Sequence, residues 1–168
     1  ENNQSIYLYY TFKPAPRPAI GVTVSGMVVS FGEESEKTTV QLFPSGSETP
    51  AFVVMLTGNT AKYSFEGVEA GTYTMKVMKK NHVTREYTVT VGAENVTQDV
   101  EIWLLGDVNG DGTINAKDKK IIYGHINDSS TELTGYIFDV GDVNKDGVIN
   151  AKDKKLIFGH ISGTSLWS

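Results

Sequence analysis

Two hydrophobic periodicities divide the sequence near Leu105. Before that residue, apolar and polar side chains alternate, most clearly where polar residues separate Tyr73, Met75 and Val77. A period of two gives a strand one apolar face and one polar face. Seven such segments, spaced as in an antiparallel sandwich, predict strands within 21–31, 37–44, 51–57, 61–68, 71–79, 82–91 and 96–105.

These segments predict one all-β domain over residues 19–104, an antiparallel sandwich. Residues 1–18 stand apart because Pro14, Pro16 and Pro18 favour an extended linker. Residues 1–12 are rich in aromatic side chains, which fits a first strand or the tail of a preceding module. That aromatic cluster favours one face of a sheet over a sugar-stacking surface.

A short motif refines the expected sandwich. Phe65, Val68, Gly71 and Tyr73 are spaced as F-x-x-V-x-x-G-x-Y, which resembles a tight corner in carboxypeptidase-regulatory or transthyretin-like sandwiches. The resemblance implies an immunoglobulin- or transthyretin-like fold. It implies little about function, because such sandwiches serve many roles.

The second half of the chain is dominated by an internal repeat. Residues 106–126 read GDVNGDGTINAKDKKIIYGHI, and residues 141–161 differ from them at only four of 21 positions. After each acidic loop, apolar residues recur with helical spacing. The repeat predicts two loop–helix units within a second domain, residues 105–168.

Each repeat carries the oxygen donors of a calcium loop. Asp or Asn stands at loop positions 1, 3 and 5, glycine at 6 and Asp at 12, a spacing that aims hard oxygen ligands at one point. Position 7 supplies a backbone carbonyl, and position 9 contributes directly or through water. We expect two Ca²⁺ ions, bound by Asp107, Asn109, Asp111, Thr113, Asn115 and Asp118, and by Asp142, Asn144, Asp146, Val148, Asn150 and Asp153.

Composition excludes several other functions. The chain has no cysteine, so disulfides, thiolate metal sites and a cysteine nucleophile are ruled out. A net charge of −5 without a basic, aromatic groove argues against nucleic acid. No apolar run suits a membrane span and no signal-peptide pattern opens the chain, so we expect a soluble region of a longer protein.

The histidines and carboxylates suggest no catalytic site. His82 lies at an expected strand start, where we predict a surface turn residue, and His125 and His160 lie near helix ends, where capping or packing is expected. Outside the calcium loops, the acidic run at 33–36 is predicted to be a solvated loop. A hydrolase is therefore the least supported of the functions considered.

The tandem sequences GDVNGDGTINAKD and GDVNKDGVINAKD resemble a dockerin, the module that binds a cohesin on a scaffoldin. The resemblance implies structural calcium ions and a helical face that holds cohesin, including loop positions 10 and 11. Type I dockerins often carry Ser-Thr there, whereas this chain has Ala-Lys, which points to a divergent cohesin class. With helical spacing added, the expected partner-binding residues are Ala116, Lys117, Lys120, Ile121 and Gly124, with Ala151, Lys152, Lys155, Leu156 and Gly159 in the second copy.

A sandwich directly before a dockerin resembles the X-module and dockerin pair of scaffoldins. We therefore expect abutting domains, with Trp103–Leu105 packed near Leu166 or Trp167. The resulting hypothesis is a secreted, non-enzymatic anchoring module, monomeric when free, that joins a cellulosome-like assembly through cohesin. The alternative is a carbohydrate-binding or adhesion module in which the calcium repeats are only structural.

Overall fold

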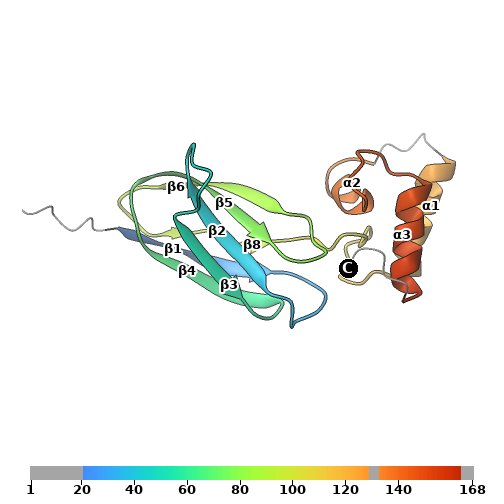
Figure 1. The fold of residues 1–168 in the computed structure, drawn as a ribbon, viewed down its shortest axis with the longest axis horizontal. Coiled ribbons are helices and arrows are strands. Elements are labelled where there is room, and N and C mark those ends of the chain that lie inside the picture. The colour runs from blue at the N-terminus through green and yellow to red at the C-terminus, as the bar shows by residue number, and fades with distance from the viewer. Residues whose placement is uncertain (1–20, 129–132, 164–168) are drawn as a thin grey trace, which may run out of the picture.

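The structure, a computed structural model, describes residues 21–128 and 133–163. An elongated molecule places a β domain at one end and a helical region at the other (Figure 1). The β domain contains strands β1 (Val22–Val29), β2 (Thr38–Pro44), β3 (Phe52–Leu56), β4 (Thr60–Val68), β5 (Gly71–Met78), β6 (Arg85–Val91), β7 (Val96–Thr97) and β8 (Val100–Glu101). The first six confirm the predicted strands, whereas the seventh segment forms two short strands.

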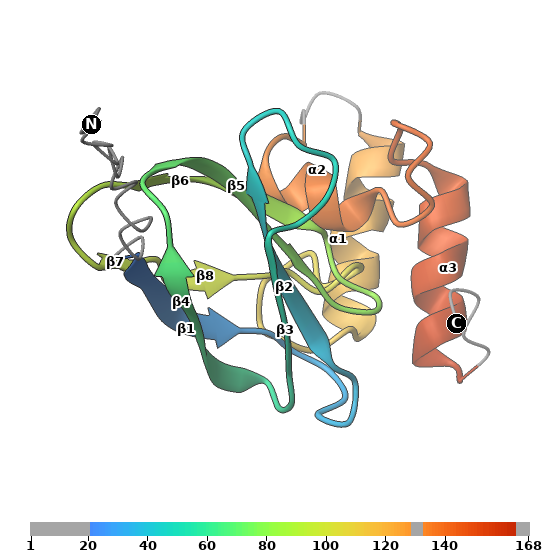
Figure 2. The same ribbon diagram turned by 60° about the vertical axis from the view of Figure 1, so that its left-hand side comes forward.

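The strands form two sheets that face each other (Figure 2). One sheet has the order β3-β2-β5-β6 and is antiparallel throughout, while in the other β1 pairs with β4 on one side and with β7 and β8 on the opposite side. Alternate residues of both sheets meet in one core, which includes Val24, Leu42, Phe65, Met75 and Val89. Residues 21–101 are therefore a two-layer sandwich.

The prediction of a wholly antiparallel sandwich was wrong at β1. Both β7 and β8 run parallel to β1. The pairing continues between them because Asp99 Oδ1 accepts from Met27 N at 2.8 Å and Ser25 O accepts from Gln98 N at 2.8 Å. A Cβ atom at Gly26 would lie 2.1 Å from Gln98 O, so this close approach requires glycine.

The predicted corner lies between β4 and β5. Phe65, Val68 and Tyr73 are buried there, and the Tyr73 hydroxyl donates to Glu69 O at 3.0 Å. The short connection and this hydrogen bond hold β5 in the second sheet, opposite β4. The motif thus marks the point where the chain changes layers.

The helical region contains α1 (Ala116–Asn127), α2 (Tyr136–Gly141) and α3 (Ala151–Ile161). Its core includes Ile122 from α1, Val140 from α2 and Ile157 from α3, all fully buried. The sequence did not predict α2, because the N-cap of this six-residue helix is Gly135, which has no side chain to form a cap. No helix in the described residues is long and apolar enough to cross a membrane.

The two parts of the molecule are joined through residues 102–106. His82 forms an isolated antiparallel bridge with Leu104, Val83 N donates to Trp103 O at 2.8 Å, and Leu105 N donates to Asn81 O at 2.9 Å. Val83 and Trp103 also pack against the helical core. The expectation that the domains abut without a free linker agrees with these contacts, whereas Leu166 and Trp167, the expected partners of Trp103, lie outside the described residues.

His82 is not a surface residue, so that prediction was wrong. It is 4 % exposed, its Nε2 accepts from Phe31 N at 3.2 Å, and its Nδ1 lies 2.7 Å from Lys80 O. Since Phe31 N is a donor and Lys80 O an acceptor, this geometry requires the neutral tautomer with its proton on Nδ1. Burial lowers the His82 pKa below its ordinary value.

The buried neutral His82 predicts loss of stability in mild acid. The unfolded chain gains a proton as the pH falls through about 6.5, whereas the folded pKa is lower, so the free energy of unfolding should fall by up to about 1.4 kcal/mol per pH unit until the folded pKa is reached. Urea denaturation between pH 8 and pH 5 measures this slope. His82→Gln should have a flatter profile, and parallel profiles for the two proteins would contradict the assignment.

Candidate metal loops and helix surface

The first loop is folded around the carboxylate of Asp107. Its Oδ1 accepts from Asp111 N at 3.1 Å and its Oδ2 accepts from Gly112 N at 2.8 Å. Asn109 Oδ1 also accepts from Asp111 N, at 3.0 Å, and Asp111 Oδ1 accepts from Thr113 N at 3.1 Å. The predicted side chains at positions 1, 3 and 5 therefore meet on the inside of one tight turn.

The second loop repeats this geometry residue by residue. Asp142 Oδ1 and Oδ2 accept from Asp146 N at 3.1 Å and from Gly147 N at 2.8 Å. Asn144 Oδ1 accepts from Asp146 N at 2.9 Å, and Asp146 Oδ1 accepts from Val148 N at 3.2 Å. Near-identical sequence has produced near-identical loops.

At position 12, Asp118 ties both ends of its loop to the start of α1. It is fully buried, its Oδ1 accepts from Val108 N at 2.8 Å and Asn109 N at 3.0 Å, and its Oδ2 accepts from Asn115 N at 2.8 Å. In the second copy, Asp153 is also fully buried and accepts from Asn144 N and Asn150 N. The Asp side chain at position 12 thus reaches the loop backbone in both copies.

The residues at position 9 have a role that the sequence analysis missed. Asn115 is the N-cap of α1 and its Oδ1 accepts from Lys117 N at 2.9 Å, while Asn150 caps α3 and accepts from Lys152 N at 2.8 Å. Each Asn also donates through Nδ2 to the carbonyl at position 7, Thr113 O or Val148 O. The signal was present as a capping box, Asn followed three residues later by Asp.

The donor set suits a hard cation. All the predicted donors are oxygen, and burial together with the nearby charges of Asp118 and Asp111 raises the Asp107 pKa, against the hydrogen bonds from Gly112 and Asp111. A cation at the loop would relieve this repulsion. In the described residues, no group of three or more His, Cys, Asp or Glu side chains is arranged to hold a metal.

The two loops differ in their surroundings. A Cβ atom at Gly112 would lie 2.9 Å from Phe31 Cδ1, so the Phe31 ring of the sandwich rests on loop 1, whereas at Gly147 the same atom would meet nothing within 4 Å. Tyr136 adds a second contact to loop 1, since its hydroxyl donates to Asp107 O at 2.7 Å. Loop 1 is therefore packed at Gly112, whereas loop 2 is open at Gly147.

The segment that carries Phe31 is itself held by buried polar groups. Lys79 Nζ donates to Phe31 O at 2.9 Å, to Asn59 Oδ1 at 2.7 Å and to Ser30 Oγ at 3.3 Å. Burial lowers the Lys79 pKa, although the charges of Glu36, Glu34 and Glu33 oppose this shift. Together with the His82 bond, these contacts fix the chain after β1 against loop 1.

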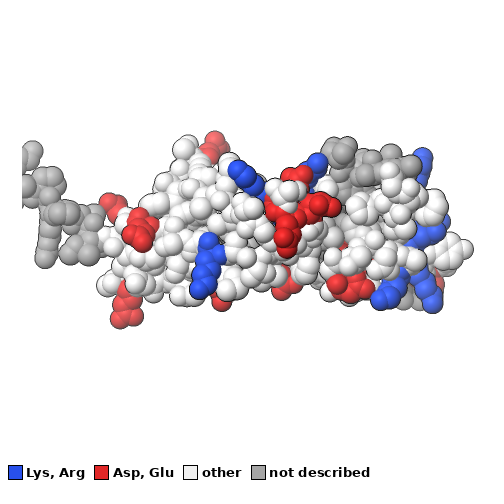
Figure 3. All heavy atoms as spheres, turned by 90° about the horizontal axis from the view of Figure 1, so that it is seen from below, with Lys and Arg blue, Asp and Glu red and all other residues white. Residues whose placement is uncertain are grey.

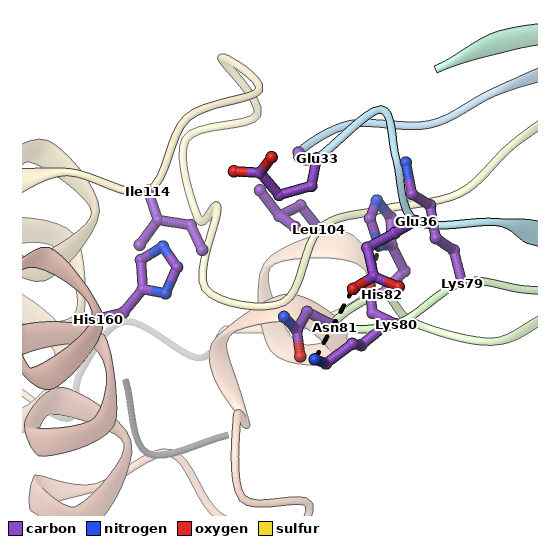
Figure 4. Close-up of a pocket in the computed structure, with 10 residues that line it drawn as sticks. Glu33, Glu36, Lys79, Lys80, Asn81, His82, Leu104, Ile114 and His160 are labelled. Atoms are coloured by element: carbon purple, nitrogen blue, oxygen red, sulfur yellow. Dashed lines mark hydrogen bonds and ion pairs between the residues drawn. The ribbon is translucent and has the colours of Figure 1, made fainter. Parts of the chain in front are cut away.

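A cavity of about 220 Å³ lies between the sandwich and the helical region. Figure 4 shows Ile114 and His160 on the helical side, facing Glu33, Leu104 and His82 on the sandwich side. The Glu36 and Lys80 side chains are 3.8 Å apart at its edge. The His82 nitrogens are already used by backbone groups.

The predicted partner-binding residues are exposed on α1 but only partly so on α3. Ala116, Lys117, Lys120, Ile121 and Gly124 are all exposed. In the second copy, Ala151, Lys152 and Lys155 are exposed, Leu156 is half-buried against the helical core, and Gly159 is buried. The prediction that Gly159 lies on the partner-binding surface was therefore wrong. Gly159 has the same position in its helix as the exposed Gly124, but its surroundings bury it.

The sequence analysis also missed a contact between α1 and α3. Lys119 Nζ lies 4.1 Å from the centre of the Phe158 ring, and Lys154 Nζ lies 4.8 Å from the centre of the Tyr123 ring. Both rings remain about half exposed, at 53 % for Tyr123 and 51 % for Phe158. These reciprocal cation–π contacts link the two copies of the repeat.

Trp103 closes the junction from the sandwich side. Its ring meets Tyr136 edge to face, with centroids 4.8 Å apart, and Arg85 Cζ lies 4.0 Å from its ring centre. Tyr136 in turn holds loop 1 through Asp107 O. A continuous set of contacts therefore runs from β6 to the first loop.

Comparison with known families assigns the helical region. The dockerin type I domain family matches residues 105–162. Residues 105–162 are a dockerin domain. Domains of this family bind calcium, in agreement with the oxygen-lined loops, and no curated protein sequence matches the chain.

Comparison with solved structures gives partial similarities. Two mutants of a type II cohesin–X-dockerin complex from Acetivibrio cellulolyticus align over 84 % of this chain and 96 % of theirs, with 24 % and 22 % identity and a TM-score of 0.40. A putative carbohydrate binding protein from Bacteroides uniformis aligns over 48 % of this chain and 40 % of its own, with 19 % identity and a TM-score of 0.34.

The contact of Phe31 with Gly112 predicts that the sandwich supports calcium binding at loop 1. Phe31→Ala should weaken calcium binding there by roughly fivefold, the equivalent of about 1 kcal/mol, because loop 1 would lose its packing. Loop 2 should be unaffected. Calcium titrations followed through the backbone amide NMR signals of Gly112 and Gly147 separate the two loops.

Phe43→Ala is the matched control. Phe43 is a half-buried phenylalanine on β2 that lies beneath Lys76. This variant should keep the wild-type calcium affinity at both loops. Equal effects of the two substitutions, or an effect of Phe31→Ala on loop 2 alone, would contradict the predicted coupling.

Proposed function

We propose that this chain is a calcium-dependent anchoring module that binds a cohesin and so attaches its parent protein to an extracellular, cellulosome-like complex for polysaccharide degradation. The observation that carries the proposal is the pair of matching loops in the dockerin segment, each opening into a helix with exposed lysines. The partner proposed here is the one named for the similar complexes.

Two Ca²⁺ ions belong to this proposal, one in each loop. Calcium supplies positive charge to converging carboxylates and couples metal binding to folding. Asp107, Asn109, Asp111 and the Thr113 carbonyl would hold the first ion, with Asp118 closing the loop and Asn115 acting through water. Asp142, Asn144, Asp146, Val148, Asn150 and Asp153 would have the same roles in the second.

The helices supply the proposed cohesin surface. On α1 it comprises the exposed Ala116, Lys117, Lys120, Ile121 and Gly124, and on α3 Ala151, Lys152 and Lys155, with Leu156 at its edge. The repeats are related closely enough that one cohesin site could accept either helix, by a rotation of about half a turn. The few residues that calcium does not use would set the cohesin class.

The sandwich would act as an X-module beside the dockerin domain. Its contacts through Trp103, Phe31 and His82 support a structural role, and we propose an immunoglobulin- or transthyretin-like fold with a boundary between residues 104 and 105. Neither module would be catalytic. The aromatic cluster within residues 1–12, on which a carbohydrate-binding alternative depends, lies outside the described residues.

Calcium removal tests the proposed function directly. The full 168-residue chain should bind cohesin with calcium present and lose binding in a chelator, because the converging loop carboxylates would repel one another without the cation. Surface plasmon resonance against a panel of type I and type II cohesins measures this. Calcium-independent capture by insoluble polysaccharide, without binding to any cohesin, would favour the carbohydrate-binding alternative instead.

Paired lysine substitutions test the two proposed orientations. Lys117→Ala with Lys120→Ala on α1, or Lys152→Ala with Lys155→Ala on α3, should each weaken cohesin binding only about twofold, because one of two equivalent modes remains. All four substitutions together should abolish measurable binding. A large loss from either pair alone would show that one helix is used.

A further inference from the structure

One lysine of each helix reaches back to its own loop. Lys117 Nζ lies 3.3 Å from Asp111 Oδ2, and Lys152 Nζ lies 3.0 Å from Asp146 Oδ2. The carboxylate at position 5 is thus paired with the lysine at position 11 in both copies. The lysine side chains are 74 % and 72 % exposed, so they remain accessible from solvent.

The position of these lysines makes the pairing significant. Lys117 and Lys152 are the second residues of α1 and α3, and their backbone N–H groups bind the caps Asn115 and Asn150. A cation in the first turn of a helix is unfavourable, because the helix dipole is positive there. The carboxylate of Asp111 or Asp146 offsets that cost.

We propose that Lys117 and Lys152 are counter-ions of the position-5 carboxylates, and that calcium displaces them toward carboxylates of the binding partner. This inference rests on the proposed calcium sites and on the proposed partner surface. In each repeat, one lysine side chain would belong to both the calcium site and the partner surface. Calcium would therefore change the charge presented on the partner surface as well as the fold of the loop.

Coulomb's law gives the direction of the effect. Loop 1 holds the carboxylates of Asp107, Asp111 and Asp118, and Lys117 neutralises part of their charge. A divalent cation bound to Asp111 would repel an ammonium group a few ångströms away and would remove the excess negative charge that attracts it. Because both groups face solvent, screening keeps the effect small.

The chemistry of the partner follows from the charges around these lysines. Lysine or arginine side chains gather at the helical end of the molecule (Figure 3), where α1 and α3 carry Lys117, Lys119, Lys120, Lys152, Lys154 and Lys155. The chain as a whole has a net charge of −5. A partner surface that presents Asp or Glu carboxylates opposite the released ammonium groups is the complementary one.

Calcium affinity separates this role from a general effect of charge. The double variant Lys117→Met with Lys152→Met should bind calcium about two- to fivefold more tightly than a matched control, Lys120→Met with Lys155→Met. Both variants remove the same charge from the same helices, and Lys120 and Lys155 are exposed without an ion pair in the described structure. Isothermal titration calorimetry on the full chain at 20 mM and 500 mM salt measures the difference, which salt should reduce.

The possible results distinguish this inference from the proposed function. Equal calcium affinities for the two variants, or weaker binding by Lys117→Met with Lys152→Met, would overturn the counter-ion role but leave calcium binding intact. Failure of the wild-type chain to bind calcium would overturn the proposed calcium sites themselves.

Amine labelling tests the displacement in the wild-type chain. Acetylation of Lys117 and Lys152 by an activated ester, followed by mass spectrometry, should increase on calcium addition relative to Lys120 and Lys155, because the ammonium groups leave their carboxylates. Labelling ratios that calcium leaves unchanged would contradict the displacement.

Discussion

The carboxylates of Asp118 and Asp153 are the groups on which the helical region depends. Each is fully buried and accepts backbone N–H groups from the beginning of its loop and from the residue that caps its helix. A buried carboxylate is tolerated only when its lone pairs are satisfied in this way. These bonds fix the helix start relative to the loop, and the helix start places Lys117 and Lys152 within reach of the position-5 carboxylates.

The sandwich packs more closely against the first of these loops than against the second. The contacts of Trp103 with Tyr136, and of Phe31 with Gly112, bring sandwich and loop together at loop 1. Lys79 and His82 hold the Phe31 segment by burying polar groups that are each satisfied by backbone or side-chain partners. A Cβ atom at Gly147 would meet nothing within 4 Å, so the two equivalent glycines lie in different environments.

This asymmetry gives the repeat two kinds of residue. The Asp side chains of the loops, the Asn caps and the buried Ile122 and Ile157 have equivalent places in both copies, since local sequence fixes them. By contrast, Gly124 is exposed and Gly159 buried.

The reciprocal contacts of Lys119 with Phe158 and Lys154 with Tyr123 keep part of the symmetry at the surface. A partner that accepts both helices must therefore rely on residues close to the loops.

The sequence by itself determined the features that depend on short-range spacing. These are the first six strands, the loops with oxygen donors at fixed intervals, the helices that follow them, and the exposed face of α1. Only the tertiary structure decided the features that depend on contacts between distant residues: the parallel pairing of β7 and β8 with β1, the burial of His82, the weakly marked α2, and the placement of Phe31 on Gly112. The physical reason is that periodicity and ligand spacing act within one turn or strand, whereas burial depends on which surfaces the chain brings together.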